Sequence, residues 1–234
     1  MELKMLDWDS VFFGKRIYAL HLGKDEDIID AEIQIQKVNA DLVYIFIPVD
    51  SDIRTTLDNR SEIIMYDHKL TYKMLLNGQK FNISNDIEEV NYDPGKDFIS
   101  LAISSGIFSR FSLDPKLNYR FEEMYELWLR NSLNRNIADK VFVSKEDGFI
   151  KSFITCKIRN GVGTIGLIAT HKEYRGKSLG RHLIDRAHHW YQYNNVNYSE
   201  VVTQKANTIA CAFYEKYGFG ITREELVYHW WIKK

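Results

Sequence analysis

The residues with the most recognisable chemistry form a short turn, Arg175 to Gly180, with the sequence RGKSLG. An apolar strand-like run at 164–169 precedes this turn, and a long amphipathic helical pattern follows it. Backbone N–H groups at a helix N-terminus have no partner within the helix and lie at the positive end of its dipole, so they can bind a phosphate or pyrophosphate. Glycine lets such a ligand come close to the backbone. The turn therefore predicts an anion-binding site.

Two phosphate-binding motifs compete for this turn. Gly176, Lys177 and Ser178 are compatible with the end of a P-loop. That motif also needs a glycine five positions before Gly176, where this chain has His171. The spacing therefore excludes a P-loop. A plain surface turn that precedes a helix is the remaining structural alternative.

The composition is that of an ordered, globular chain. Its 234 residues suit one large domain or two small ones, and a content of 45% hydrophobic residues is ample for a core. With 31 Lys and Arg against 32 Asp and Glu, the net charge of -1 disfavours nucleic acid or an anionic membrane as a partner. No apolar run has the length of a signal or membrane-spanning segment. We expect a cytoplasmic, soluble protein.

Neither the cysteines nor the histidines predict a metal site. Cys156 and Cys211 lie far apart in apolar periodic segments, which is typical of two buried thiols. His182, His188 and His189 lack the i, i+4 spacing and the accompanying acidic ligand of a helical metal site. We therefore expect no metal.

The chain is predicted to form two domains, 1–85 and 86–234. The segment 77–96 separates them because it is rich in glycine, asparagine and acidic residues and has little periodicity. The pattern of the first domain predicts a small α/β unit. Its expected elements are strands within 6–22 around a turn at Gly14, a helix at 25–38, a strand at 42–47, and a strand at 68–76.

The second domain has a longer series of elements, which ends in the order β-β-β-α-β-α-β. Asp147-Gly148 and Asn160-Gly161 are dipeptides that accept positive φ in tight hairpin turns, so three strands form an antiparallel meander. Asn207 is the expected N-cap of a helix that ends before Gly218. The expected elements are helices at 97–108 and 121–133, strands at 140–144, 148–158 and 162–169, a helix at 178–193, a strand at 200–203, a helix at 208–217 and a strand at 226–232.

The turn and the last helix together resemble the GNAT superfamily of N-acetyltransferases. Arg175 and Gly180 match the ends of its pyrophosphate turn, Arg/Gln-x-x-Gly-x-Gly/Ala, while Ser178 replaces the first glycine. A serine can offer its N–H there if its backbone dihedrals are ordinary. The run from Asn207 to Phe219 resembles the segment Asn-x-x-Ala-x-x-x-Tyr-x-x-x-Gly-Phe. The resemblance implies an α/β (α+β) fold, whose C-terminal GNAT domain has a mixed, mostly antiparallel sheet, and acetyl-CoA as co-substrate.

The resemblance also implies where acetyl-CoA binds. In this superfamily the strand before the turn and the strand after its helix splay apart, and pantetheine inserts between them. Ile168 and Thr170 would offer backbone groups to pantetheine, and the amides from Gly176 to Arg181 would hold the pyrophosphate. The expected acetyl-CoA residues are Ile168, Ala169, Thr170, Arg175, Gly176, Lys177, Ser178, Leu179, Gly180, Arg181 and Asn207.

Tyr214 is the expected catalytic residue by the same resemblance. Attack of an amine on a thioester expels a thiolate, whose conjugate acid has a pKa of about 8.5. A tyrosine hydroxyl, with a pKa of about 10, stays protonated at neutral pH and can donate a hydrogen bond or a proton to that thiolate. The structural alternative is that Tyr214 only packs beside Phe213 and Tyr217.

Further segments resemble the GNAT enzymes that N-acetylate dTDP-4-amino-4,6-dideoxygalactose (dTDP-fucosamine). These segments are 6–14, 109–111, 124–128, 165–169 and 202–208. That family joins an N-terminal α/β domain to a C-terminal GNAT domain and supplies acetylated amino sugars for surface polysaccharide. The resemblance implies a nucleotide sugar as the small-molecule substrate, with direct attack of its 4-amino group on the acetyl carbonyl.

Arg110 is our hypothesis for the cation that binds the nucleotide diphosphate, because it lies in one of these family-like segments. The alternative is an ordinary surface arginine. The sequence does not identify the base that deprotonates the sugar ammonium.

Other functions stay open at this point. The acceptor could be another nucleotide-linked amino sugar, another small amine or a peptide N-terminus. A non-catalytic acyl-CoA-binding module is a further alternative, against which the presence of both Tyr214 and the turn speaks. The aromatic strand with Tyr228, Trp230 and Trp231 could face a partner subunit of a homodimer, or it could belong to the core.

Overall fold

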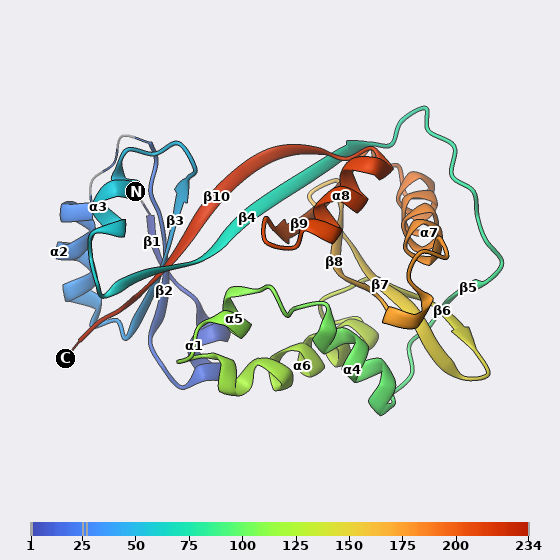
Figure 1. The fold of residues 1–234 in the computed structure, drawn as a ribbon, viewed down its shortest axis with the longest axis horizontal. Helices are drawn as coiled ribbons and strands as arrows, with labels where there is room; N and C mark the ends of the chain where they lie inside the picture. Colours follow the sequence, from blue (N-terminus) through green and yellow to red (C-terminus); the bar gives the residue numbers. More distant parts are fainter. Residues whose placement is uncertain (1, 25, 27, 234) are drawn as a thin grey trace. The chain divides into compact units, whose positions relative to one another are not determined.

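The computed structural model describes residues 2–24, 26 and 28–233, and these residues divide into two compact units (Figure 1). The first unit takes the described residues of Met1–Leu70, Gln204–Ala206 and Arg223–Lys234. The second unit is Thr71–Thr203 with Asn207–Thr222. The chain therefore enters the second unit in mid-strand and returns to the first for its last strand.

This division differs from the boundary near residue 85 that the sequence suggested. The last strand pairs with a strand of the first unit, in antiparallel register from Glu225↔Pro48 to Trp231↔Leu42. Composition can mark a flexible segment, but it does not tell which distant strand will accept a given strand as its neighbour. The division into domains 1–85 and 86–234 stays a prediction.

The first unit is a mixed sheet with helices packed on it. Its strand order is β1-β2-β3-β10, with β2 and β3 parallel and the other two pairs antiparallel. Val43, Ile45 and Ile47 of β3 form a core with Ile28 and Ile35 of α2. The elements are β1 (Glu2–Met5), α1 (Asp7–Phe13), β2 (Ile17–His21), α2 (Ile28–Val38), β3 (Leu42–Pro48), α3 (Ile53–Asp58), and parts of β4 (Ile63–Leu75) and β10 (Gly220–Trp231).

The predicted strands within 6–22 are wrong for their first half, because Asp7–Phe13 is the helix α1. Trp8 and Phe12 stack with ring centroids 4.9 Å apart. Residues four apart share a face in a strand and in a helix alike, so this pair does not distinguish the two. Two acidic residues in the first turn, Asp7 and Asp9, favour the helix, and Gly14 ends it with a φ of 63°.

The second unit contains a meander of strands with helices on both faces. Its strand order is β9-β8-β7-β6-β5, and only β8 and β9 run parallel. Figure 1 shows α7 on one side of β6, β7 and β8, and α4 with α6 on the other. The elements are β5 (Ile87–Glu89), α4 (Lys96–Ser104), α5 (Arg110–Leu113), η1 (Asn118–Arg120), α6 (Phe121–Leu133), β6 (Lys140–Glu146), β7 (Phe149–Arg159), β8 (Val162–Thr170), η2 (Lys172–Tyr174), α7 (Leu179–Tyr193), β9 (Tyr198–Gln204) and α8 (Thr208–Tyr217).

The predicted fold class is confirmed, with helices and a mixed, mostly antiparallel arrangement of strands. The order β-β-β-α-β-α-β is also confirmed for β6 to β10. Both hairpin dipeptides adopt positive φ, at 50° and 82° for Asp147 and Gly148 and at 51° and 74° for Asn160 and Gly161. These turns bring β8 back along β7 and so place its end beside α7.

The structure shows how deeply the cysteines and the aromatic residues of the last strand are buried. Cys156 is buried, as predicted, whereas Cys211 is only half-buried. Tyr228 belongs to the core of the first unit, and Trp230 packs against that core. None of the helices in the described part of the chain is long and apolar enough to cross a membrane.

Candidate active site

The end of β8 forms an open strand edge. β8 and β9 pair in parallel from Val162↔Tyr198 to Ile165↔Val201, whereas β8 continues to Thr170. The pairing with β7 shifts register beyond Ile165, where Leu167 donates its N–H to Thr155 Oγ1 at 2.8 Å. A Cβ on Gly166 would lie 2.8 Å from the same hydroxyl oxygen, so a larger residue would displace the oxygen that accepts the Leu167 N–H. The sequence-based expectation that the two strands separate is consistent with this register.

The hydrogen bonds of β8 indicate which backbone groups face the open edge. His171 N–H donates to Lys151 C=O at 2.8 Å, on the β7 side. Backbone groups of successive residues alternate between the two edges of a strand, so those of Thr170 and Ile168 point away from β7. Arg175 Nε donates to the Thr170 carbonyl at 3.2 Å, in keeping with that direction. Ile168 and Thr170 therefore direct their N–H groups to the same side.

The turn after β8 ends at the start of α7, as expected from the motif. Gly176 has a φ of 77°, and α7 begins at Leu179. The first N–H groups of a helix lack intrahelical acceptors, so the start of α7 stays the predicted site for an anion. Ser178 has a φ of 60° and a ψ of 7°, which is the left-handed region. The condition of ordinary dihedrals at Ser178 is therefore not met, because this turn requires the conformation that the family glycine adopts without strain.

Ser178→Gly is expected to stabilise the fold by roughly 0.5–1 kcal/mol, because glycine removes the left-handed penalty but gains entropy in the unfolded state. For a chain of this size the shift in Tm is about 2 °C. Denaturant unfolding measures it. Gly176→Ala is the matched control: its added Cβ meets open space, so only the φ of 77° opposes it, and stability should fall. If Ser178→Gly and the natural chain were equally stable, the left-handed conformation of Ser178 would not be strained.

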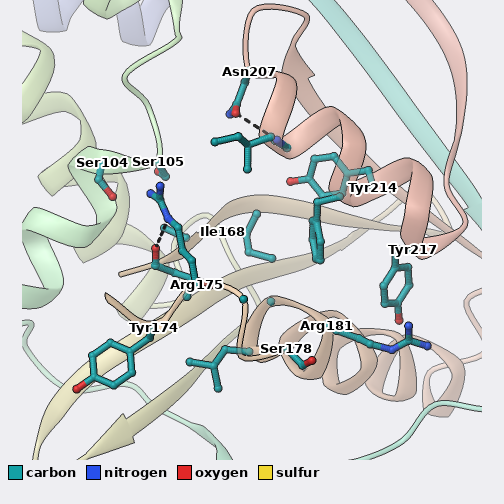
Figure 2. A pocket seen from close by; sticks show the side chains of 18 of the residues that line it. Ser104, Ser105, Ile168, Tyr174, Arg175, Ser178, Arg181, Asn207, Tyr214 and Tyr217 are labelled. Carbon is teal, nitrogen blue, oxygen red and sulfur yellow. Dashed lines mark hydrogen bonds between the residues drawn. The ribbon is translucent and has the colours of Figure 1, made fainter. Parts of the chain in front are cut away.

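A pocket of about 670 Å³ lies within the second unit, over the end of β8. Its volume is in the range of about 300–1,000 Å³ that small-molecule sites occupy. Figure 2 shows Asn207 and Tyr214 on one wall, Ser104 and Ser105 on another, and the turn with Ser178 between them. The expected site residues that line it are Ile168, Ala169, Thr170, Arg175, Gly176, Ser178, Leu179, Gly180, Arg181, Asn207 and Tyr214.

Two expected residues do not line this pocket. Lys177 places its Nζ 4.9 Å from the ring centroid of Tyr174. Arg110 stacks its guanidinium over the ring of Phe111, 4.3 Å from the centroid. The backbone amide of Lys177 still belongs to the turn. Arg110 starts α5, a short distance along the chain from Phe108, which does line the pocket.

Sequence reasoning missed part of the pocket wall. On α8, Ala210, Phe213 and Tyr217 line the pocket with Tyr214, and their i, i+3, i+4, i+7 spacing marks one helix face. This spacing is visible in the sequence and predicts that the four residues share the helix face that carries Tyr214. The segment after α4 supplies the opposite wall and has no comparable signal, because only tertiary packing brings it to β8. Its lining residues are Ser104, Ser105, Ile107 and Phe108.

Tyr214 is buried at the pocket, with 3% of its surface exposed. Burial, reinforced by the nearby Cys211 thiol, raises the pKa of the Tyr214 hydroxyl well above its ordinary value. The hydroxyl therefore stays protonated at physiological pH and is a hydrogen-bond donor. Asn207 accepts a hydrogen bond from Ala210 N–H at 3.3 Å, which confirms it as the N-cap of α8. The cap holds the first turn of the helix that carries Tyr214.

A comparison with protein families matches the segment that carries most of this pocket. Residues 107–219 match the family model described as "Acetyltransferase (GNAT) family". No curated protein matches the chain. The matched segment contains β8, the turn, α7 and α8, together with most of the pocket wall.

Solved structures share the fold at low sequence identity. A GCN5-related N-acetyltransferase from Sphaerobacter thermophilus has a TM-score of 0.52 and 15% identity over 86% of this chain, which spans 64% of that protein. A functionally unknown conserved protein from Staphylococcus epidermidis has a TM-score of 0.60 and 11% identity, with coverage of 94% and 85%. A GCN5-related N-acetyltransferase from Kribbella flavida has a TM-score of 0.51 and 10% identity, with coverage of 92% and 80%.

Residues 107–219 therefore match a GNAT acetyltransferase domain, which is the catalytic domain of acetyl-CoA-dependent N-acetyltransferases. Acetyl-CoA is the co-substrate of this family. Among the described residues, no group of three or more histidine, cysteine, aspartate or glutamate side chains could hold a metal ion.

Proposed function

We propose that this chain transfers the acetyl group of acetyl-CoA to the amino group of a nucleotide-linked amino sugar. The acceptor we propose is dTDP-4-amino-4,6-dideoxygalactose, acetylated at its 4-amino group for surface polysaccharide biosynthesis. The observation that carries the transferase part is the pocket that joins the open edge of β8, the start of α7 and the buried Tyr214. A cytoplasmic location and a homodimer stay predictions.

Acetyl-CoA would lie along the end of β8. Pantetheine would hydrogen-bond the backbone groups of Ile168 and Thr170, which face the edge that β9 leaves unpaired. Its pyrophosphate would sit on the amides from Gly176 to Arg181 at the start of α7. Asn207 would contact the cofactor through its side-chain NH₂, since its Oδ1 accepts the capping bond from Ala210 N–H.

The proposed reaction is a direct transfer. The amine nitrogen attacks the acetyl carbonyl carbon, a C–N bond forms, and the C–S bond then breaks. Backbone N–H near Ile168 would stabilise the oxyanion, and Tyr214 would give its proton to the departing sulfur. The amine loses one proton in the same turnover, which restores the tyrosine, so the products are the N-acetylated sugar and CoA with a free thiol.

The acceptor rests on the resemblance of five segments to the dTDP-fucosamine N-acetyltransferases. One of them, 109–111, follows the wall formed by Ile107 and Phe108 directly in the chain. We keep Arg110 in that segment as the proposed cation for the nucleotide diphosphate, although it is not part of the pocket lining. An arginine can bind a diphosphate through two parallel N–H donors.

The test is release of CoA thiol by the purified chain with acetyl-CoA and separate acceptors. The panel is dTDP-4-amino-4,6-dideoxygalactose, its 4-epimer and a 3-amino isomer, with a simple alkyl amine as control. We expect turnover with the first sugar to exceed turnover with the control by at least about 100-fold, because the nucleotide supplies binding energy remote from the reacting amine.

Equal turnover with the alkyl amine would contradict a nucleotide-sugar acceptor and leave the transferase intact. Turnover with the epimer or the 3-amino isomer alone would move the proposal to that sugar. Failure to bind acetyl-CoA at all would contradict the role of the pocket.

A further inference from the structure

Asp185 is a buried carboxylate that the proposed reaction does not use. It lies on α7 with 4% of its surface exposed. Tyr217 donates its hydroxyl proton to Asp185 Oδ1 at 2.5 Å. The other carboxylate oxygen, Oδ2, lies 4.0 Å from Arg181 Nε, one helical turn earlier. The carboxylate is therefore held by one pocket-lining residue and faces another.

Arg181 is the cation that compensates this buried charge. A carboxylate removed from water is costly unless it is paired. His188 lies nearby, with its Nδ1 3.4 Å from the Tyr217 hydroxyl oxygen, but burial lowers the pKa of His188 to about 3 and keeps it neutral. Among the ion pairs of the described residues, the partner of Asp185 is Arg181.

The same contacts restrain the guanidinium of Arg181 at the pocket. Its Cζ lies 5.6 Å from the ring centroid of Tyr217, and its Nε faces Asp185. Figure 2 shows the ends of the two side chains next to each other at one side of the pocket. With Nε directed at the carboxylate, the four N–H donors on the two Nη atoms are left for another anion. The Arg181 side chain is 65% exposed, so a ligand can reach it.

We propose that Asp185 is a positioning residue for the diphosphate of acetyl-CoA and acts through Arg181. The proposal rests on the proposed function, in which the start of α7 holds that diphosphate. A carboxylate near an anionic ligand repels it, so its presence favours binding only if it orders a cation. Fixing the long arginine side chain in advance lowers the entropy lost when the ligand binds.

The experiment is calorimetric titration of CoA into the natural chain and into Asp185→Asn. Asparagine keeps an oxygen for the Tyr217 hydroxyl but removes the charge that orders Arg181. We expect Kd for CoA to rise about 3- to 10-fold, since the guanidinium keeps its charge and loses its orientation. Arg181→Ala should raise Kd by at least about tenfold, because it removes charge-assisted hydrogen bonds.

A double-mutant cycle separates positioning from a structural role. In the Arg181→Ala background, Asp185→Asn should weaken CoA binding no further, because the group through which it acts is gone. Pantetheine, which lacks the diphosphate, should bind equally to the natural chain and to Asp185→Asn. A matched control is Glu215→Gln, a second carboxylate that accepts a tyrosine hydroxyl, from Tyr72 at 2.9 Å, and does not line the pocket. It should leave the CoA affinity unchanged.

The proposal would be overturned if Asp185→Asn lowered the CoA affinity equally in the natural chain and in the Arg181→Ala background. It would also be overturned if Asp185→Asn lowered the affinity for pantetheine as much as the affinity for CoA. If Asp185→Asn does not fold, Tyr217→Phe keeps the charge but releases the carboxylate from its fixed position, and the resulting loss of CoA affinity should again disappear in the Arg181→Ala background. These titrations need no acceptor. A wrong sugar therefore leaves them intact, whereas absence of CoA binding by the natural chain would contradict the proposed function itself.

Discussion

Tyr214→Phe is expected to lower kcat by at least about 100-fold, since general acid catalysis contributes about 10²- to 10⁴-fold. The variant keeps the buried aromatic ring and loses only the hydroxyl that would protonate the departing thiolate. Its affinity for CoA should therefore stay close to that of the natural chain. Steady-state rates of thiol release and a CoA titration, on the same preparation, measure both quantities.

Tyr72→Phe is the matched control for this variant. The Tyr72 ring lies 5.7 Å from that of Tyr214 and is fully buried, but its hydroxyl donates to Glu215 at 2.9 Å. Its kcat should stay within about threefold of the natural value, because no acid in the reaction is removed. Similar rate losses in both variants would show that the loss comes from packing rather than from proton donation.

The pH dependence follows from the direction of the pKa shift at Tyr214. Burial raises that pKa above the ordinary tyrosine value of about 10, so the protonated donor persists to higher pH. We expect kcat of the natural chain to show no decline from this group up to about pH 10. A descending limb below that pH which vanishes in Tyr214→Phe would contradict the raised pKa.

Ile168→Pro is expected to lower kcat/KM for acetyl-CoA by about 10²- to 10³-fold, the cost of removing one oxyanion donor. Proline has no N–H, and the N–H of Ile168, like that of Thr170, is directed to the open edge of β8. The fold should survive, because this N–H does not take part in the pairing with β7 and proline is tolerated at such edges. Thiol-release kinetics at several acetyl-CoA concentrations measure the effect.

Ile168→Ala controls for the lost side chain, since it shortens the residue and keeps the N–H. Its kcat/KM should fall by less than about tenfold, the scale of a partly buried apolar group. Thermal unfolding of both variants reports any damage to β8. If proline and alanine reduce kcat/KM equally in folded protein, the backbone donor has no role in the reaction.

Local patterns in the sequence determined much of the second unit. α6 and α8 have the predicted bounds because their apolar spacing, the Asn207 cap and Gly218 all act within a few residues along the chain. The two hairpins were predictable for the same reason, from the positive φ that Asp-Gly and Asn-Gly accept. The turn at Arg175 to Gly180 also followed from local chemistry, since a strand, a glycine and a helix start suffice to describe it.

The tertiary structure decided the features that depend on distant partners. Three of these features join residues that are far apart in the chain. They are the pairing of β10 with β3, the packing of the pocket wall after α4 near β8, and the hydrogen bond between Asp185 and Tyr217. The left-handed Ser178 was set by the path of the backbone, which forced the conformation despite the side chain. Periodicity reports only which residues share a face. Which surface that face meets is settled by packing across the whole fold, where burial and pairing outweigh local preference.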